Sequence, residues 1–234
     1  MSNQVAKARR TDHLVAIAKF MVAVLVAKVL LSMLAEYRWY FPANFEAAFL
    51  IGRHDYFAGI YAIAFYAHII SGPLTIVLGA LLLWSGLRAH FPRWHRWAGR
   101  GQVLLIVLVL TPSGLVMARH ALTGPIAGTG FALHALATAT CAVAAAYTAF
   151  AGRWMTHQHW ANRCLLLSIA PLLFRLVSGA LIVTQAESEW VYRMNAWLSW
   201  LVPLLLYEAW RSGQLAQRRA PRLNVTTLPA KASP

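Results

Sequence analysis

Apolar residues along this chain are grouped into six runs, which short polar and basic segments separate. A helix needs about 20 apolar residues to cross a bilayer at a rise of roughly 1.5 Å per residue. Each run is close to that length, and the segments between the runs are too short to form a separate domain. The pattern predicts an all-α fold, a six-helix integral membrane bundle with helices at 14–34, 57–84, 102–118, 127–150, 164–184 and 191–210.

The composition is typical of a protein that is solvated largely by lipid. Hydrophobic residues make up 59% of the 234 residues and charged residues 12%, with a mean hydropathy of +0.55. An ordinary soluble domain is about 25% charged, so a soluble single domain and a large extramembrane catalytic domain are excluded. The formal charge of +14 would suggest nucleic acid in a soluble protein, but membrane topology explains it better and we expect no nucleic acid partner.

The basic residues also predict the orientation of the helices. Lys and Arg in short loops resist translocation, so the side that carries more of them stays in the cytoplasm. Six spans put both termini on one side, where fourteen Lys and Arg residues flank the spans against four on the other side. We expect a multi-pass protein of the cell inner (cytoplasmic) membrane, with a basic cytoplasmic N-terminus at 1–13, a transmembrane domain at 14–210 and a basic, disordered cytoplasmic tail at 211–234 on anionic lipid.

Four landmarks recur in the same order in two parts of the chain, which indicates an internal repeat. The second copy follows the first at offsets of 66, 65, 64 and 63 residues: His68 and His134, Arg88 and Arg153, His95 and His159, Arg100 and Arg163. The matches predict that repeat A (57–118) and repeat B (127–184) are copies of one helical hairpin. Their four helices would form the core, with the first and last helices outside it.

The repeat turns the histidines into pairs on facing helices, with His68 and His134 in the outer half and His95 and His159 at the cytoplasmic ends. Such pairs can hold haem iron axially, so the leading hypothesis is a haem b-binding electron carrier with one or two haems. Five arginines are available for haem propionates or an acidic donor: Arg88, Arg100, Arg153, Arg163 and Arg175. Alternatively, each imidazole donates a hydrogen bond to a carbonyl or a Ser of a neighbouring helix, or His157, His159 and His95 bind a transition metal.

Arg175 is a second candidate site, because a buried guanidinium needs an anion or a dipole. It lies near the middle of the fifth predicted helix, and no acidic residue lies at that depth in another predicted span. Pro171 should free a backbone carbonyl near Leu167. The carbonyls, a haem propionate, or the head group of a quinone or lipid could each meet Arg175. The runner-up hypothesis is a non-redox membrane carrier or accessory subunit that binds a lipid, quinone or small anion, and a structural subunit of a larger membrane complex is a third.

The order and spacing of seven landmarks resemble the bacterial family of predicted membrane proteins called domain of unknown function 2306: His68, Arg88, His95-Arg96, Gly99-Arg100, His159-Trp160, Arg163 and Arg175. The resemblance covers most of residues 60–185 and implies a membrane fold without a particular activity. More distantly, the bundle looks like the ascorbate-linked two-haem transmembrane cytochrome b family. That resemblance implies an outer haem between His68 and His134, a cytoplasmic haem between His95 and His159, and a transmembrane oxidoreductase.

Overall fold

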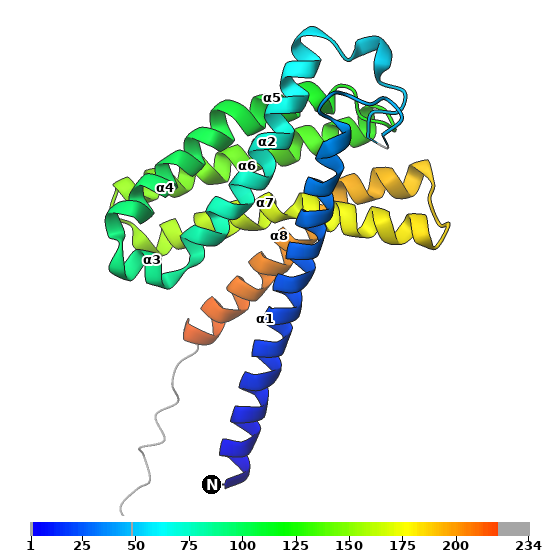
Figure 1. Cartoon of the computed structure of the whole chain (residues 1–234). Helices are drawn as coiled ribbons and strands as arrows, with labels where there is room; N and C mark the ends of the chain where they lie inside the picture. The colour runs from blue at the N-terminus through cyan, green and yellow to red at the C-terminus, as the bar shows by residue number, and fades with distance from the viewer. Residues whose placement is uncertain (1, 48, 220–234) are drawn as a thin grey trace, which may run out of the picture.

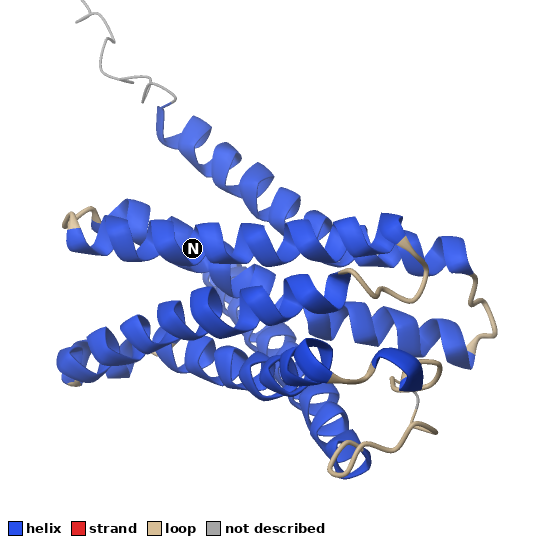
Figure 2. Cartoon of the chain, turned by 90° about the horizontal axis from the view of Figure 1, so that it is seen from above, coloured by secondary structure: helices blue, strands red, loops and turns tan. Residues whose placement is uncertain are grey.

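The computed structural model describes residues 2–47 and 49–219, and these form a protein of helices and short connections (Figure 1). No strand occurs in this part of the chain, as Figure 2 shows. The helices are α1 (Ser2–Glu36), α2 (Gly59–Leu83), α3 (Ser85–His90), α4 (Pro92–Leu105), α5 (Thr111–Ala118), α6 (Pro125–Phe150), α7 (Trp154–Val183) and α8 (Glu189–Arg219). Single 3-10 turns lie at η1 (Tyr37–Trp39) and η2 (His54–Tyr56), and the π-helical segment η3 (Ile106–Leu110) joins α4 to α5 without a break.

Five helical segments of the described residues are long and apolar enough to cross a membrane: Phe20–Trp39, Gly59–Leu83, Pro92–Ala118, Pro125–Phe150 and Trp154–Val183. They confirm the all-helical membrane fold and five of the six expected spans. The sixth, expected at 191–210, lies in α8, where Arg193, Asn195 and Glu208 interrupt the apolar residues.

The helix ends differ from the expected ends mainly where basic and aromatic residues are dense. The expected helices at 102–118 and 164–184 begin ten residues earlier, at Pro92 and Trp154. Arg, Trp and His have adequate helix propensity, so the helix continues where the hydropathy has already fallen. For the same reason residues 211–219, expected in the disordered tail, are the end of α8. The rest of that tail lies outside the described residues.

Four helical segments surround a common interior: α2, the continuous α4–η3–α5 segment, α6 and α7. α2 packs against α5 and α7, and α6 packs against α5 and α7 in turn. Ile106, Cys141 and Leu167 lie in this interior together with Trp200 of α8, which packs on α6 and α7. The four segments expected in the core therefore pack together, whereas α8, expected outside the core, also reaches its interior through Trp200.

α1 crosses the other helices obliquely and leaves them along most of its length (Figure 1). Among the long helices it packs mainly against α7. Phe20 and Leu31 are 67% and 65% exposed, as expected of side chains that face lipid. α1 therefore contributes to the interior only near its C-terminal end, at Glu36 and the turn that follows.

Candidate functional site

His68 of α2 and His134 of α6 both reach the interior of the four-helix core. The Nδ1 atom of His68 lies 3.3 Å from the Ser113 hydroxyl of α5, which itself donates to carbonyls of its own helix. Gly114 makes room for the ring, since a Cβ atom there would lie 3.3 Å from His68 Cε1. His134 and Arg175 both lie in the neighbourhood of the His68 ring. The structure therefore brings this predicted pair into one region.

The proline of α7 determines the hydrogen bond of His134. Pro171 has no N–H group, so the carbonyl four residues earlier, that of Leu167, has no donor in its own helix. His134 Nε2 donates to this carbonyl at 2.9 Å, from a different helix. The carbonyl that the sequence predicts to be free near Leu167 thus has a partner. A hydrogen bond from an imidazole to a carbonyl of a neighbouring helix is also what the alternative to haem binding predicts.

The same arrangement occurs once more, between α1 and α2. Pro73 lies inside α2 and leaves the carbonyl of Ile69 without a donor from its own helix. The hydroxyl of Tyr37, in the turn after α1, donates to that carbonyl. In both helices, the carbonyl that a proline leaves without a donor therefore accepts a hydrogen bond from a side chain outside that helix.

The two histidines of the predicted second pair have different neighbours. His159 Nδ1 lies 3.1 Å from the Tyr207 hydroxyl of α8, among the charges of Arg211, Arg163 and Glu208. The neighbours of the His95 ring are Arg88 and His157 instead. His157 Nδ1 donates to the Ala145 carbonyl at 2.8 Å. No hydrogen bond joins His95 to His159 among the described residues, and these residues contain no group of three or more His, Cys, Asp or Glu side chains that could hold a metal ion.

Arg163 is engaged in an ion pair that joins α7 to α8. Its Nε and Nη2 atoms donate to the Glu208 carboxylate at 2.5 and 2.9 Å, and its guanidinium stacks on Trp160. Arg211 adds a contact of 3.7 Å to the same carboxylate. The sequence did not predict that Arg163 pairs with Glu208, because 45 residues separate the two. Arg88 near the end of α3, Arg100 within α4 and Arg153 in the turn between α6 and α7 are all exposed.

Arg175 of α7 has an acidic neighbour, which corrects the expectation that none lies at its depth. Its Nη1 atom lies 3.7 Å from the Glu36 carboxylate. α1 continues two residues beyond its predicted end and crosses α7 there, so a residue counted outside the first span reaches the fifth. The Arg175 side chain is 37% exposed, and none of the hydrogen bonds among the described residues involves it. Its donors are therefore open to a further partner.

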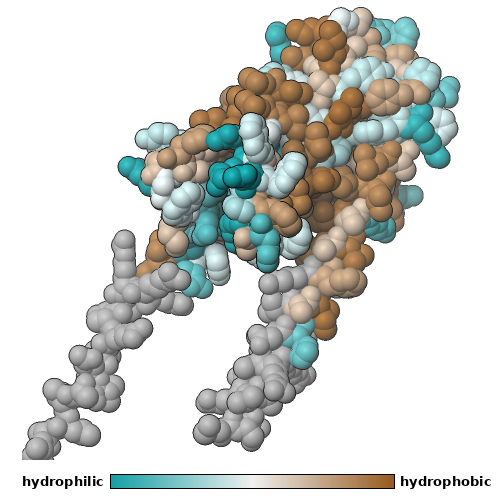
Figure 3. Space-filling model, turned by 60° about the vertical axis from the view of Figure 1, so that its left-hand side comes forward, coloured by the Kyte–Doolittle hydropathy of each residue, from teal (hydrophilic) through white to brown (hydrophobic). Residues whose placement is uncertain are grey.

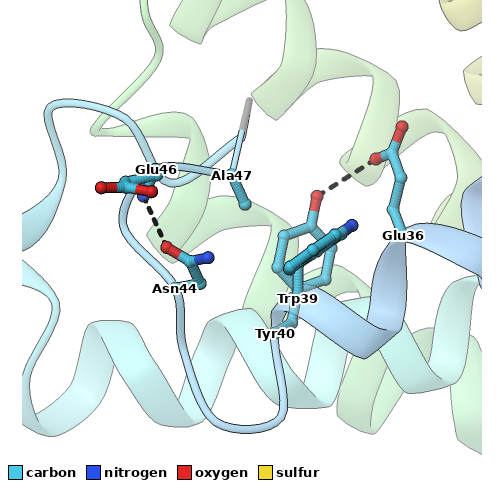
Figure 4. A pocket seen from close by; sticks show the side chains of 6 residues that line it. All are labelled: Glu36, Trp39, Tyr40, Asn44, Glu46 and Ala47. Carbon is cyan, nitrogen blue, oxygen red and sulfur yellow. Dashed lines mark hydrogen bonds between the residues drawn. The ribbon is translucent and has the colours of Figure 1, made fainter.

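Glu36 also lies at the edge of a hollow of about 350 Å³, which η1 and the following loop line. Figure 4 shows Tyr40 directing its hydroxyl to the Glu36 carboxylate, at 3.2 Å, while Glu46 and Asn44 lie at the other end of the hollow. Burial, and secondly the negative charge of Glu36, raises the pKa of Tyr40 to about 12. Tyr40 therefore remains a hydrogen-bond donor to Glu36 across the physiological pH range.

Arg53 and Gln102 are buried polar residues that the sequence reasoning did not single out. Arg53 donates to the Tyr56 and Tyr61 hydroxyls at 3.1 Å and to the His120 carbonyl at 3.0 Å, and so holds the α1–α2 loop onto the end of α5. Gln102 donates to the Thr75 carbonyl at 3.0 Å, while its Oε1 atom is buried without a partner among the described residues. The aromatic residues near Arg53 in the sequence could have indicated that it is buried. For Gln102 the sequence offers only a polar residue at the start of an apolar run.

The fold and these polar contacts define a multi-pass helical membrane protein. The chain belongs to the family of predicted membrane proteins called DUF2306, which matches residues 65–211, more than half of the chain. This confirms the family resemblance drawn from the histidine and arginine landmarks. The matched part includes the four histidines and Arg175 but not Glu36. Neither the curated proteins nor the solved structures contain a match to this chain.

Proposed function

We propose that this protein is a non-redox membrane carrier or accessory subunit that binds the polar head group of a quinone or a lipid at Arg175. The observation that supports the proposal is the state of the Arg175 guanidinium. It offers five N–H donors, yet its charged neighbour lies at 3.7 Å and it makes no hydrogen bond to the described residues. Donors near the apolar part of a bilayer need acceptors, and an oxygen-bearing head group supplies them.

The neighbouring carboxylate narrows the chemistry of the head group. Glu36 repels a small anion that approaches Arg175, but it accepts a hydrogen bond from a hydroxyl or amine. A head group that offers an acceptor oxygen to Arg175 and a hydroxyl to Glu36 satisfies both side chains. A quinol, whose hydroxyl groups both accept and donate hydrogen bonds, and a glycerolipid head group with ester oxygens and a free hydroxyl have this combination, so they fit the Arg175–Glu36 site better than a simple inorganic anion.

Binding of a short-chain quinone to the detergent-purified protein tests the proposal. Arg175→Ala should weaken binding about tenfold or more, because a hydrogen bond to a charged group contributes about 1.5–3 kcal/mol. Arg119→Ala, at an exposed position after α5, is the matched control and should bind like the unchanged protein. Equal affinities for the Arg175 and Arg119 variants, in quinone and in lipid titrations, would count against the site.

A haem b-binding electron carrier is the second candidate, and the convergence of His68 and His134 favours it. Haem b would supply one-electron transfer. His68 suits a ligand, because its Nδ1 atom already has a hydrogen-bond partner, as is common for metal-bound imidazoles. His134 suits one less well, because its Nε2 atom is occupied by the Leu167 carbonyl. This difference within the pair is why the haem hypothesis ranks second.

An absorption spectrum separates the two candidates. A haem carrier purified from cells with ample haem supply should show a sharp band after reduction with dithionite, and His68→Ala should abolish it. The carrier without redox chemistry should be colourless before and after reduction. A full haem content that persists in both His68→Ala and His134→Ala would rule out this pair as ligands.

The orientation of the chain in the membrane and the duplicated hairpin are part of the same proposal. We place both termini in the cytoplasm and the protein in the inner membrane, supported by the fourteen basic residues on one side against four on the other. The duplicated hairpin is supported by helix lengths: α2 has 25 residues and α6 has 26, and the segments that follow, Pro92–Ala118 and Trp154–Val183, have 27 and 30.

A further inference from the structure

Arginine and tryptophan side chains gather at one end of the core, around the start of α4. We call this set the basic–aromatic face: Arg93, Trp94, Arg96, Trp97 and Arg100 of α4, and Arg153 in the turn between α6 and α7. All six side chains are exposed. Figure 3 shows hydrophilic side chains gathered at this end of the molecule, directly beside hydrophobic ones.

Helical spacing puts the residues of α4 on one side. Arg93, Arg96 and Arg100 follow one another at three and four residues, the spacing of neighbours on a helix surface. The Arg100 guanidinium lies 5.3 Å from the Trp97 ring and 5.9 Å from the ring of Phe150, the last residue of α6. Arg153 follows three residues after Phe150, so the face continues from α4 onto the α6–α7 turn.

The described residues do not balance the positive charge of this face. No acidic residue occurs between Asp55 and Glu187. The ion pairs among the described residues use Glu36, Asp55, Glu189 and Glu208, and none includes an arginine of the face. No acidic side chain of the described residues therefore neutralises this face, and an external anion can do so.

We propose that the basic–aromatic face binds the phosphate group of anionic phospholipids. Arginine pairs with phosphate through two parallel hydrogen bonds. The N-terminal end of α4 adds favourable backbone dipoles, and its first turn carries no acidic residue.

The exposed tryptophans identify lipid, rather than an acidic soluble protein, as the partner. Trp94 and Trp97 are 69% and 67% exposed. Tryptophan is enriched at the depth of the lipid head groups, where one part of the ring is in contact with acyl chains and another with water. Arginines beside such rings lie at the depth of the lipid phosphates, and within reach of them.

Native mass spectrometry of the full chain in detergent tests this proposal, with phosphatidylglycerol as the anionic probe and phosphatidylcholine as the zwitterionic one. The unchanged protein should retain more phosphatidylglycerol than phosphatidylcholine. The triple variant Arg93→Gln, Arg96→Gln, Arg100→Gln should lose that preference. The matched control is Arg38→Gln with Arg119→Gln, which removes exposed arginines from the opposite end and should keep the preference.

Each of the following results would overturn the proposal: no preference in the unchanged protein, a triple variant that retains lipid like the unchanged protein, or loss of the preference in the control. Inorganic phosphate distinguishes a lipid site from a general anion site, since displacement of the lipid by millimolar phosphate also contradicts it. If the triple variant fails to fold, the three single variants answer the same question, each with a part of the loss. The outcome does not depend on the ligand of Arg175.

Discussion

At the scale of single residues, two prolines free backbone carbonyls that polar side chains of other helices then bind. Pro171 leaves the Leu167 carbonyl free and His134 donates to it, and Pro73 leaves the Ile69 carbonyl free for Tyr37. An unpaired carbonyl in a bilayer costs free energy comparable to a lost hydrogen bond. His134 therefore has a structural role whether or not a ligand binds nearby.

The hydrogen bond between His134 and Leu167 predicts a coupling between His134 and Pro171. His134→Phe should lower the free energy of unfolding by about 1 kcal/mol, the usual net contribution of such a bond. In a Pro171→Ala background the Leu167 carbonyl regains a donor from its own helix, so the same change should cost much less. A double-mutant cycle in reversible detergent unfolding measures the difference.

A matched control for this cycle is Thr140→Val, on the lipid-facing side of α6, where the hydroxyl bonds to the carbonyl of Leu136 in its own helix. It should show no coupling to Pro171. If His134→Phe costs the same free energy with and without Pro171, then the proline-freed carbonyl does not account for the position of His134.

At the scale of elements, α7 and α8 are joined by one charged cluster. The Glu208 carboxylate receives two hydrogen bonds from Arg163 and a longer contact from Arg211. Tyr207, the residue before Glu208 in α8, is contacted by His159 and by Asn162, both of α7. The cluster attaches a helix whose own residues are too polar to be recognised as a span.

Glu208 should therefore be the most sensitive position of this junction. Glu208→Gln leaves two guanidinium groups close together without a carboxylate, and we expect a loss of about 1–2 kcal/mol in the free energy of unfolding, reduced by partial exposure. The double variant Arg163→Gln, Glu208→Gln should lose less than Glu208→Gln alone. Thermal unfolding in detergent measures both, and Glu189→Gln, in the exposed pair with Arg193, is the control. A double variant that is less stable than Glu208→Gln would contradict a role for repulsion.

The sequence predicted the elements well where apolar residues alone define a helix, as in α2 and α6. It did not predict the first ten residues of α4 and of α7, because Arg, Trp and His carry helix propensity but little hydropathy. Contacts between distant parts of the chain were the harder problem. The pairing of Arg163 with Glu208, and of Arg175 with Glu36, depends on which helices cross, and neither hydropathy nor spacing contains that information. The repeat paired His95 with His159 in the sequence, yet α8 provides the neighbour of His159.

At the scale of the whole molecule, the number of spans, five or six, determines the side of the membrane on which the end of the last helix lies. An odd number of crossings places the two ends of the chain on opposite sides, and an even number places them on the same side. α8 has 31 residues, enough in length for a crossing, but its polar residues exclude it from the apolar segments. Its packing against α6 and α7, as well as the basic residues at its end, favours a sixth crossing.

Cysteine labelling in intact cells decides between the two topologies, and the background is low because Cys141 and Cys164 are both buried. With six spans, a membrane-impermeant maleimide should label Glu187→Cys from outside but should label Leu215→Cys only after the cells are opened. Arg119→Cys and Arg153→Cys give the reference for the outer and cytoplasmic sides, since α6 separates them. If Leu215→Cys is labelled together with Glu187→Cys, α8 does not cross. Trp200 of α8 lies in the buried cluster with residues of α6 and α7, and this contact is why we expect the six-span labelling pattern.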